Sequence, residues 1–239
     1  MTVGFGFQTG IAAALIALLA LGAAMDAPAR AQSPTEPGWQ DTPWEQRVGI
    51  PYFRKRAEQG DAEAAYRLGQ LYEQGLEGQR SLSSALEWYA LAAEAGHPLG
   101  QFKTALLLES GAAGQLDVSS AAGWYEKAAA QGVTAAKFNL ARFYEAGLGL
   151  PRDLAKAAAL YEEAARGGIA AAARNLGNLY LLGQGVPQDR VEALAWLILA
   201  EAQGAPGAAK LRADLEAQLD AAGRDKALAR AKALGAKNG

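Results

Sequence analysis

A glycine recurs at every thirty-sixth position through most of this chain, at Gly60, Gly96, Gly132, Gly168 and Gly204. A period of this length is typical of a unit made of two helices and a turn, and one such unit cannot bury its own apolar face. Neighbouring units must therefore stack on one another. The spacing predicts an all-α solenoid, an architecture whose extended surface usually serves binding.

The residues between these glycines recur in the same frame and indicate which positions pack. Each expected second helix carries two alanines that flank an aromatic or leucine pair, as at Ala85, Trp88, Tyr89 and Ala92. The corresponding pairs are Trp124-Tyr125, Leu160-Tyr161 and Trp196-Leu197, with alanines at 121 and 128, 157 and 164, and 193 and 200. Small residues let helices approach closely and large ones fill the remaining space. We therefore predict that this aromatic stripe is core and not a ligand site.

The turns repeat with the same period. Gly75, Gly111, Gly147 and Gly183 are expected to end the first helices in the left-handed conformation, as the glycines named above end the second helices. Ser81, Asp117, Asp153 and Asp189 are expected to cap the amino ends of the second helices. Asp189 with Glu192 fits a capping box, and His97 fits the same turn position as Asp61. The Asp residues among these caps are therefore interpreted as structural.

The first 31 residues have the pattern of a signal peptide. An apolar run, 11–24, precedes the small residues Ala29 and Ala31, which suit cleavage after Ala31. The segment before that run has no Lys or Arg, which leaves an uncleaved membrane anchor as the alternative. The chain has no cysteine, so neither a lipidated cysteine nor a disulfide framework is available. We expect a periplasmic or secreted protein, or else one anchored by its amino-terminal segment.

The remaining organisation follows from composition and period. We expect a disordered linker over 32–43, an amino-terminal capping half-repeat over 44–60, and a carboxy-terminal capping helix with a basic tail over 205–239. The four full units are 61–96, 97–132, 133–168 and 169–204. Within 208–220 the spacing of Leu211, Leu215 and Leu219 predicts a helix that closes the array. The basic stretch 224–237 is expected to be a short alanine-rich helix or a frayed tail, dissolved in solvent and with at most peripheral membrane contact.

Composition argues against several functional classes. The 23 Lys and Arg residues are balanced by 25 Asp and Glu residues, so no strong positive field would attract nucleic acid. His97 is the only histidine and there is no cysteine, so a nitrogen–sulfur metal site or a Cys–His nucleophile pair cannot be built. We therefore expect no enzyme activity, no metal and no cofactor.

Several recurring segments resemble a known family. They are Leu68-Gly69-Gln70-Leu71-Tyr72, Trp88-Tyr89, the stretch from Trp124 to Gly132, and the stretch from Leu176 to Val186. These segments are similar to the Sel1-like repeat, a relative of the tetratricopeptide repeat, and the resemblance extends over 61–204. The second unit fits least well, with Thr104-Ala105-Leu106-Leu107-Leu108 in place of a Leu-Gly…Tyr pattern. The resemblance implies a right-handed α–α superhelix that acts as a non-catalytic adaptor or scaffold, in bacteria often in the envelope.

The first helices of such an array are expected to line a concave groove, where partner recognition would lie. The exposed polar positions there are Arg67, Lys103, Asn139, Arg142, Arg174, Asn175 and Asn178. Amide side chains can pair with the main chain of an extended peptide, and the cations can hold a carboxylate. These residues are the candidate partner-binding site, weighed against an ordinary polar surface.

The sequence thus predicts a scaffold of the bacterial envelope that binds a partner protein or extended peptide through its groove and could regulate a signalling or assembly system. Two alternatives belong to other classes. One is a binder or hydrolase of cell-wall fragments or β-lactams, although the paired cysteines of the β-lactam-linked relatives are absent. The other is a purely structural member of a larger envelope assembly.

Overall fold

The computed structural model describes residues 49–75 and 80–235. The expected signal peptide (1–31), the linker (32–43), the start of the half-repeat near Trp44 and the last four residues of the basic tail lie outside the described residues.

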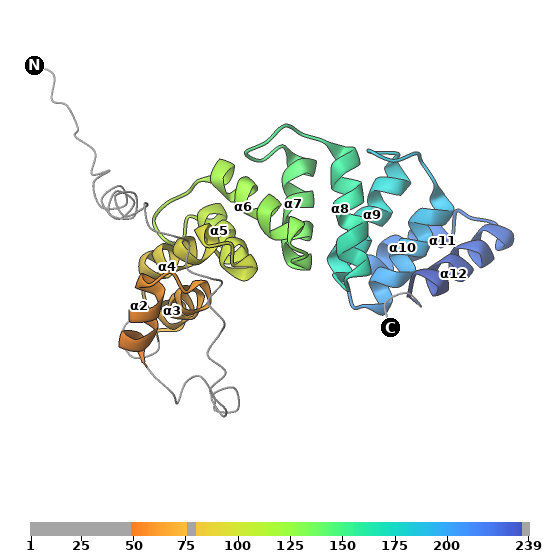
Figure 1. Ribbon diagram of the computed structural model, residues 1–239. Helices are drawn as coiled ribbons and strands as arrows, with labels where there is room; N and C mark the ends of the chain where they lie inside the picture. Colours follow the sequence, from red (N-terminus) through yellow and green to blue (C-terminus); the bar gives the residue numbers. More distant parts are fainter. Residues whose placement is uncertain (1–48, 76–79, 236–239) are drawn as a thin grey trace, which may run out of the picture. The chain divides into compact units, whose positions relative to one another are not determined.

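Eleven helices, and no strands, occur in the described part of the chain. They are α2 (Ile50–Glu58), α3 (Ala62–Gln74), α4 (Leu82–Glu94), α5 (Pro98–Ser110), α6 (Val118–Ala130), α7 (Thr134–Ala146), α8 (Leu154–Arg166), α9 (Ala170–Leu182), α10 (Arg190–Ala202), α11 (Ala208–Glu216) and α12 (Ala221–Gly235). From α2 to α10 each helix packs on the next one along the chain, and α10 also contacts α11 and α12 (Figure 1). The first helices are α3, α5, α7 and α9, and the second helices are α4, α6, α8 and α10. This consecutive packing confirms the all-helical solenoid.

The helix ends confirm the predicted turn chemistry. Gly75, Gly111, Gly147 and Gly183 all have φ between 63° and 75° and follow the last residue of a first helix. Ser81, Asp117, Asp153 and Asp189 each accept a backbone N–H from the first turn of a second helix. The side chain of His97 does the same for α5, where its Nδ1 accepts from the Gly100 N–H at 3.0 Å.

The expected capping box at the start of α10 is wrong in its second half. Asp189 accepts from the Glu192 N–H as predicted, but the Asp189 N–H donates to the carbonyl of Tyr180 in the preceding first helix. The Glu192 carboxylate instead accepts from Trp196 and from Arg230 of α12. The tertiary partners replace the local reciprocal bond.

The core consists of the predicted alanines and the large residues between them. All eight alanines of the second-helix pattern are completely buried, and so are Tyr89, Tyr125, Tyr161 and Leu197. A Cβ atom on Gly69 would lie 2.5 Å from the ring of Tyr89, so only glycine lets α3 approach α4 this closely. The three tyrosines, Trp196 and Leu197 of the stripe are therefore core, whereas Trp88, Trp124 and Leu160 are only partly buried and pack against it.

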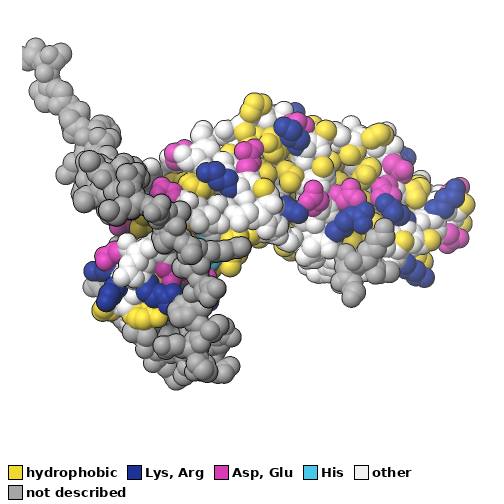
Figure 2. Space-filling view, viewed as in Figure 1, with side chains coloured by type: hydrophobic (Ala, Val, Ile, Leu, Met, Phe, Trp, Pro, Cys, Tyr) yellow, Lys and Arg dark blue, Asp and Glu magenta, His cyan; other side chains and the backbone are white. Residues whose placement is uncertain are grey.

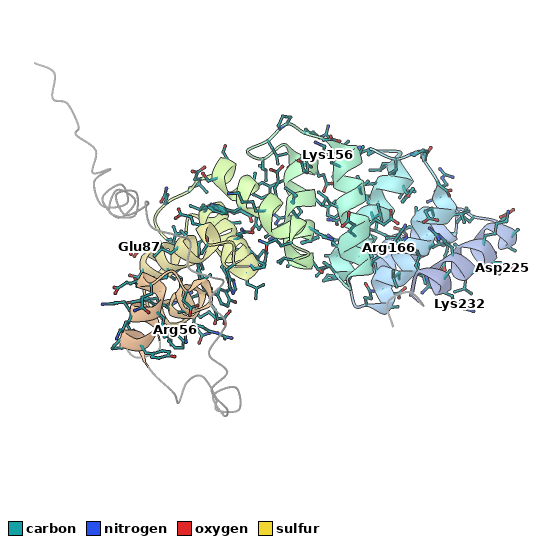
Figure 3. All side chains as sticks on the ribbon, viewed as in Figure 1. Arg56, Glu87, Lys156, Arg166, Asp225 and Lys232 are labelled. Carbon is teal, nitrogen blue, oxygen red and sulfur yellow. The ribbon has the colours of Figure 1, made fainter. Side chains whose placement is uncertain are left out.

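The carboxy-terminal end agrees with the helical alternative of the prediction. Leu215 of α11 is buried, and Leu211 and Leu219 pack against the same core, as a closing helix requires. The stretch 224–235 forms most of α12 and is not a frayed tail, and α12 packs on α10 with Ala227, Ala231 and Leu234 buried. Ala227 and Ala231, four residues apart, lie on one face of α12, and a charged residue directly precedes each of them in the sequence. Figure 3 shows Asp225 and Lys232 on this helix.

None of the described helices is both long enough and apolar enough to cross a membrane.

Candidate functional site

The predicted partner-binding residues all lie on first helices: Arg67 on α3, Lys103 on α5, Asn139 and Arg142 on α7, and Arg174, Asn175 and Asn178 on α9. Most of them are engaged with other residues of the chain. The structure therefore separates those that hold the solenoid together from those that remain available to a partner.

Lys103, Glu73 and Tyr89 form a polar trio that joins the first two units. The ammonium group of Lys103 lies 2.9 Å from one oxygen of Glu73 and 3.1 Å from the other. The same Glu73 carboxylate accepts the hydroxyl hydrogen of Tyr89 at 2.5 Å. Because Lys103 and Glu73 each expose only about a quarter of their side chains, 28% and 26%, this ion pair is part of the interface between units.

Asn139 occupies the same place in the second trio and is not an exposed residue. The Tyr125 hydroxyl donates to Glu109 at 2.5 Å and accepts from the Asn139 amide at 3.1 Å. Asn139 is only 8% exposed, so the prediction that it lines an open surface is wrong. The amide faces the preceding second helix because a buried phenol there needs a second partner.

A third trio starts in the same way, with Tyr161 donating to Glu145 at 2.5 Å and Asn175 at the position equivalent to Asn139. Burial first, and then the hydrogen bond to a carboxylate, raise the pKa of Tyr161, as they do for Tyr89 and Tyr125, above the ordinary value of 10.0. Burial alone would raise the pKa of Glu73, but hydrogen bonds from Tyr89 and Lys103 outweigh it and hold that pKa below 4.5. At neutral pH the three tyrosines are therefore neutral, and Glu73 is ionised.

Sequence reasoning missed the acidic members of these trios. Glu73, Glu109 and Glu145 recur with the period of 36 residues, each sixteen residues before its tyrosine. The signal was present, because in the fourth unit both positions change together, to Leu181 and Leu197. A joint loss of both partners is the pattern expected of two groups that contact each other.

Two further candidates pair with acids near the surface. Arg67 contacts Glu63, four residues earlier on α3, at 2.6 Å. Arg142 lies 3.4 Å from Glu109, and its side chain keeps 43% of its surface exposed. A long contact at an exposed position contributes little to stability, so Arg142 can exchange this partner for another at low cost.

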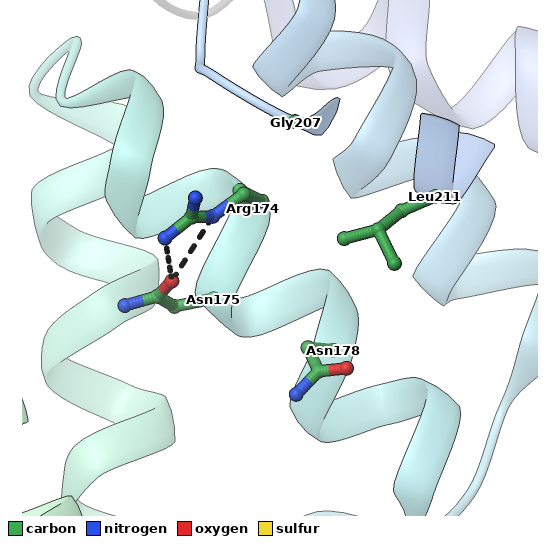
Figure 4. Close-up of a pocket in the computed structure, with 5 residues that line it drawn as sticks. All are labelled: Arg174, Asn175, Asn178, Gly207 and Leu211. Carbon is green, nitrogen blue, oxygen red and sulfur yellow. Dashed lines mark hydrogen bonds between the residues drawn. The ribbon is translucent and has the colours of Figure 1, made fainter. Parts of the chain in front are cut away.

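The remaining three candidates meet at a pocket beside α9. Arg174, Asn175 and Asn178 line it together with Gly207 and Leu211, and its volume is about 270 Å³ (Figure 4). The Arg174 guanidinium donates to the Asn175 side-chain oxygen through Nε and Nη2, and to the Pro206 carbonyl through Nη1 at 3.0 Å. No carboxylate of the described residues forms an ion pair with it.

His97 is accounted for by structure. Its Nδ1 accepts the Gly100 N–H, so Nε2 carries the hydrogen and donates to Glu63 at 2.9 Å. The ring also stacks on Tyr66 with centroids 4.5 Å apart. The hydrogen bond from His97 is the largest cause that lowers the pKa of Glu63 below its ordinary value. His97 thus joins α3 to α5 as a cap and a stacking partner.

The residues that the structure describes contain no cluster of three or more His, Cys, Asp or Glu side chains suited to a metal ion. On the face shown in Figure 2, Lys and Arg side chains are interspersed with Asp and Glu side chains. Mixed signs of this kind create no extended field for a polyanion.

Four consecutive segments, 62–97, 98–133, 134–169 and 170–204, match the family model described as Sel1 repeat. No curated protein sequence matches the chain.

The solved structures similar to this chain include the following two. One is a Sel1 repeat protein from Oxalobacter formigenes, with 34% sequence identity and a TM-score of 0.61 over 70% of this chain and 48% of that chain. The other is a protective antigen of uropathogenic Escherichia coli strains that displays an SLR fold, with 30% identity and a TM-score of 0.53 over 79% of this chain and 48% of that chain. The present chain thus spans about half the length of each.

Proposed function

Since this chain belongs to the Sel1 repeat family, we propose that it is a non-catalytic scaffold of the bacterial envelope that binds a partner protein or an extended peptide along its first helices. Sel1 repeats generally mediate protein–protein interactions, which supports binding as the role. The regulation of a signalling or assembly system would follow from which partner is held.

One observation carries the choice of surface. Arg142, Arg174 and Asn178 belong to two adjacent units, occupy the same helical face of α7 and α9, and keep polar groups that the fold does not fully use. The Asn178 amide makes no hydrogen bond with any residue that the structure describes, and Arg142 makes only one long contact. An extended peptide offers alternating carbonyl and N–H groups, which an amide and two guanidinium groups can bind at low desolvation cost.

The envelope location rests on the sequence. The apolar run 11–24 followed by Ala29 and Ala31 supports export with cleavage after Ala31. Cell fractionation and amino-terminal sequencing of the protein from the native cell test this directly. A mature chain that begins at Gln32 in the envelope fraction is expected, and an intact chain in the cytoplasm would contradict the proposal.

The binding surface is tested by envelope cross-linking and affinity capture with Arg142→Ala/Asn178→Ala. Lys103 is unsuitable, because an acidic replacement would face the Glu73 carboxylate and weaken the fold. The matched control is Lys156→Ala/Gln184→Ala, which removes one exposed cation and one exposed amide from elsewhere; Figure 3 shows Lys156 near the start of α8. A partner that both the wild type and the control capture, and the first variant does not, supports the surface. Equal capture by all three would exclude it.

A further inference from the structure

The fourth unit departs from the other three in a coordinated way. In the first three units an aromatic side chain of the first helix packs on the tyrosine of the second helix: Tyr66 on Tyr89, Phe102 on Tyr125 and Phe138 on Tyr161, with ring centroids 5.6, 6.0 and 5.9 Å apart. In the fourth unit the corresponding residues are Arg174 and Leu197. The polar trio changes as well, to Leu181, Leu197 and Leu211.

These substitutions have opposite chemical effects. Leucine at all three trio positions replaces every polar partner at once, so no polar group is left without a partner. Leu197 is completely buried. By contrast, Arg174 places a charged side chain where the other three units have an aromatic ring that packs on the second helix. Its guanidinium turns to the surface, and the pocket of about 270 Å³ opens beside it.

Arg174 is also electrostatically different from the other predicted cations. Arg67, Lys103 and Arg142 each have a carboxylate partner, whereas Arg174 has none among the described residues. Three of its five N–H groups donate to neutral oxygens, of Asn175 and Pro206, which leaves two unused. A partly desolvated guanidinium with neutral partners still favours an anion.

We propose that this pocket binds a carboxylate carried beside a small apolar group of the partner. The free N–H groups of Arg174 hold the carboxylate, the Asn178 amide donates to it, and the Leu211 side chain contacts the apolar group. Figure 4 shows Arg174 bonded to Asn175 on one side of the pocket and Leu211 on the other. A volume just below the range of about 300–1,000 Å³ for drug-sized ligands suits a single side chain or chain end. The proposal rests on the proposed partner-binding face and assigns the chemistry of one part of it.

The competing explanation is that Arg174 only ties α9 to the segment that precedes α11. The contact with the Pro206 carbonyl fits that role. It does not require a positive charge, because a neutral amide could donate to the same carbonyl, nor does it account for the unpaired Asn178 beside it. Binding measurements separate the two explanations, because a purely structural residue would not make recognition depend on the charge of the ligand.

The test uses the isotopically labelled full chain and three acetylated dipeptide probes followed by NMR. Acetyl-Ala-Leu has a free terminal carboxylate, acetyl-Ala-Leu-amide lacks it, and acetyl-Ala-Glu-amide carries a carboxylate on its side chain only. Saturable shifts of the amide signals around Arg174 and Gly207 are expected with one or both carboxylate probes and not with the neutral one. The carboxylate probe that binds tells whether the partner presents a chain end or an acidic side chain.

Arg174→Gln is expected to weaken binding of the carboxylate probe by about tenfold or more, because a charged hydrogen bond contributes roughly 1.5–3 kcal/mol. Arg174→Lys, which keeps the charge without the planar fork, should recover part of the loss. Arg230→Gln is the control, since it breaks the pair with Glu192 in the same terminal region and should leave the affinity unchanged. Equal binding of charged and neutral probes, no saturable shifts, or full affinity in Arg174→Gln would overturn the carboxylate pocket. Partner capture in the preceding experiment would be unaffected by that result.

Discussion

Tyr125 donates its hydroxyl hydrogen to Glu109 across 2.5 Å and so joins α6 to α5 in the interior of the array. Asn139 of α7 adds a second bond to the same oxygen, which makes one phenol the meeting point of three helices. The polar positions of the first helices are thus divided between two uses. In the first three units they mostly stabilise the stack, and near the fourth they remain open to a partner.

Tyr125→Phe is expected to destabilise the chain by about 1–3 kcal/mol, because it leaves the buried Asn139 amide without its acceptor. Chemical denaturation followed by circular dichroism measures the change. Tyr52→Phe at the exposed start of α2 is the control and should stay within about 0.5 kcal/mol of the wild type. Equal effects would show that the hydroxyl of Tyr125 contributes nothing specific.

Acid should weaken the fold through Glu73. Because the folded state holds the pKa of Glu73 below 4.5, its contribution to stability is present above pH 4.5 and is lost as the pH falls below that value. Glu73→Gln should therefore be less stable than the wild type at neutral pH, and the difference should shrink in acid. Thermal unfolding across this range checks the trend, with the exposed Glu94→Gln as control. A difference that is independent of pH would refute the role of the ionised carboxylate.

Alkali should act through the buried tyrosines. Tyr89, Tyr125 and Tyr161 have pKa values raised above 10.0, so the stability that comes from their neutral form is present below pH 10 and lost as the pH rises further. Their ionisation should coincide with the loss of helicity, as measured by tyrosinate absorbance and circular dichroism together. In Tyr125→Phe the absorbance change at that transition should be smaller by one tyrosine. If the absorbance change were equally large in Tyr125→Phe and in the wild type, the ionisation of Tyr125 in this transition would be contradicted.

Gly149 should tolerate substitution less well than Gly168. Both have positive φ, 64° and 90°, so alanine at either position costs about 1–2 kcal/mol in backbone strain. A Cβ on Gly149 would in addition lie 2.5 Å from the carbonyl oxygen of Val118, whereas a Cβ on Gly168 would meet no atom within 4 Å. Gly149→Ala should therefore lower the free energy of unfolding more than Gly168→Ala does. Equal losses would mean that the loop after α7 does not press on the start of α6.

The sequence by itself determined the period of the array, the helix-ending glycines and the buried alanine and tyrosine positions of the second helices. These features depend on short-range rules: a left-handed glycine ends a helix, an oxygen caps the next one, and apolar side chains recur with the helical period. The family resemblance was visible for the same reason.

Only the tertiary structure decided which polar residues are available. Asn139 and Asn175 occupy equivalent positions in consecutive units and look alike in the sequence, yet Asn139 is buried against a phenol and Asn175 lines a pocket beside Arg174. The tertiary structure likewise decided that the basic stretch packs on α10, where Arg230 meets Glu192, 38 residues away in the chain. Such partners lie on other helices, so the approach of the packed helices fixes their pairing, and no local pattern can express it.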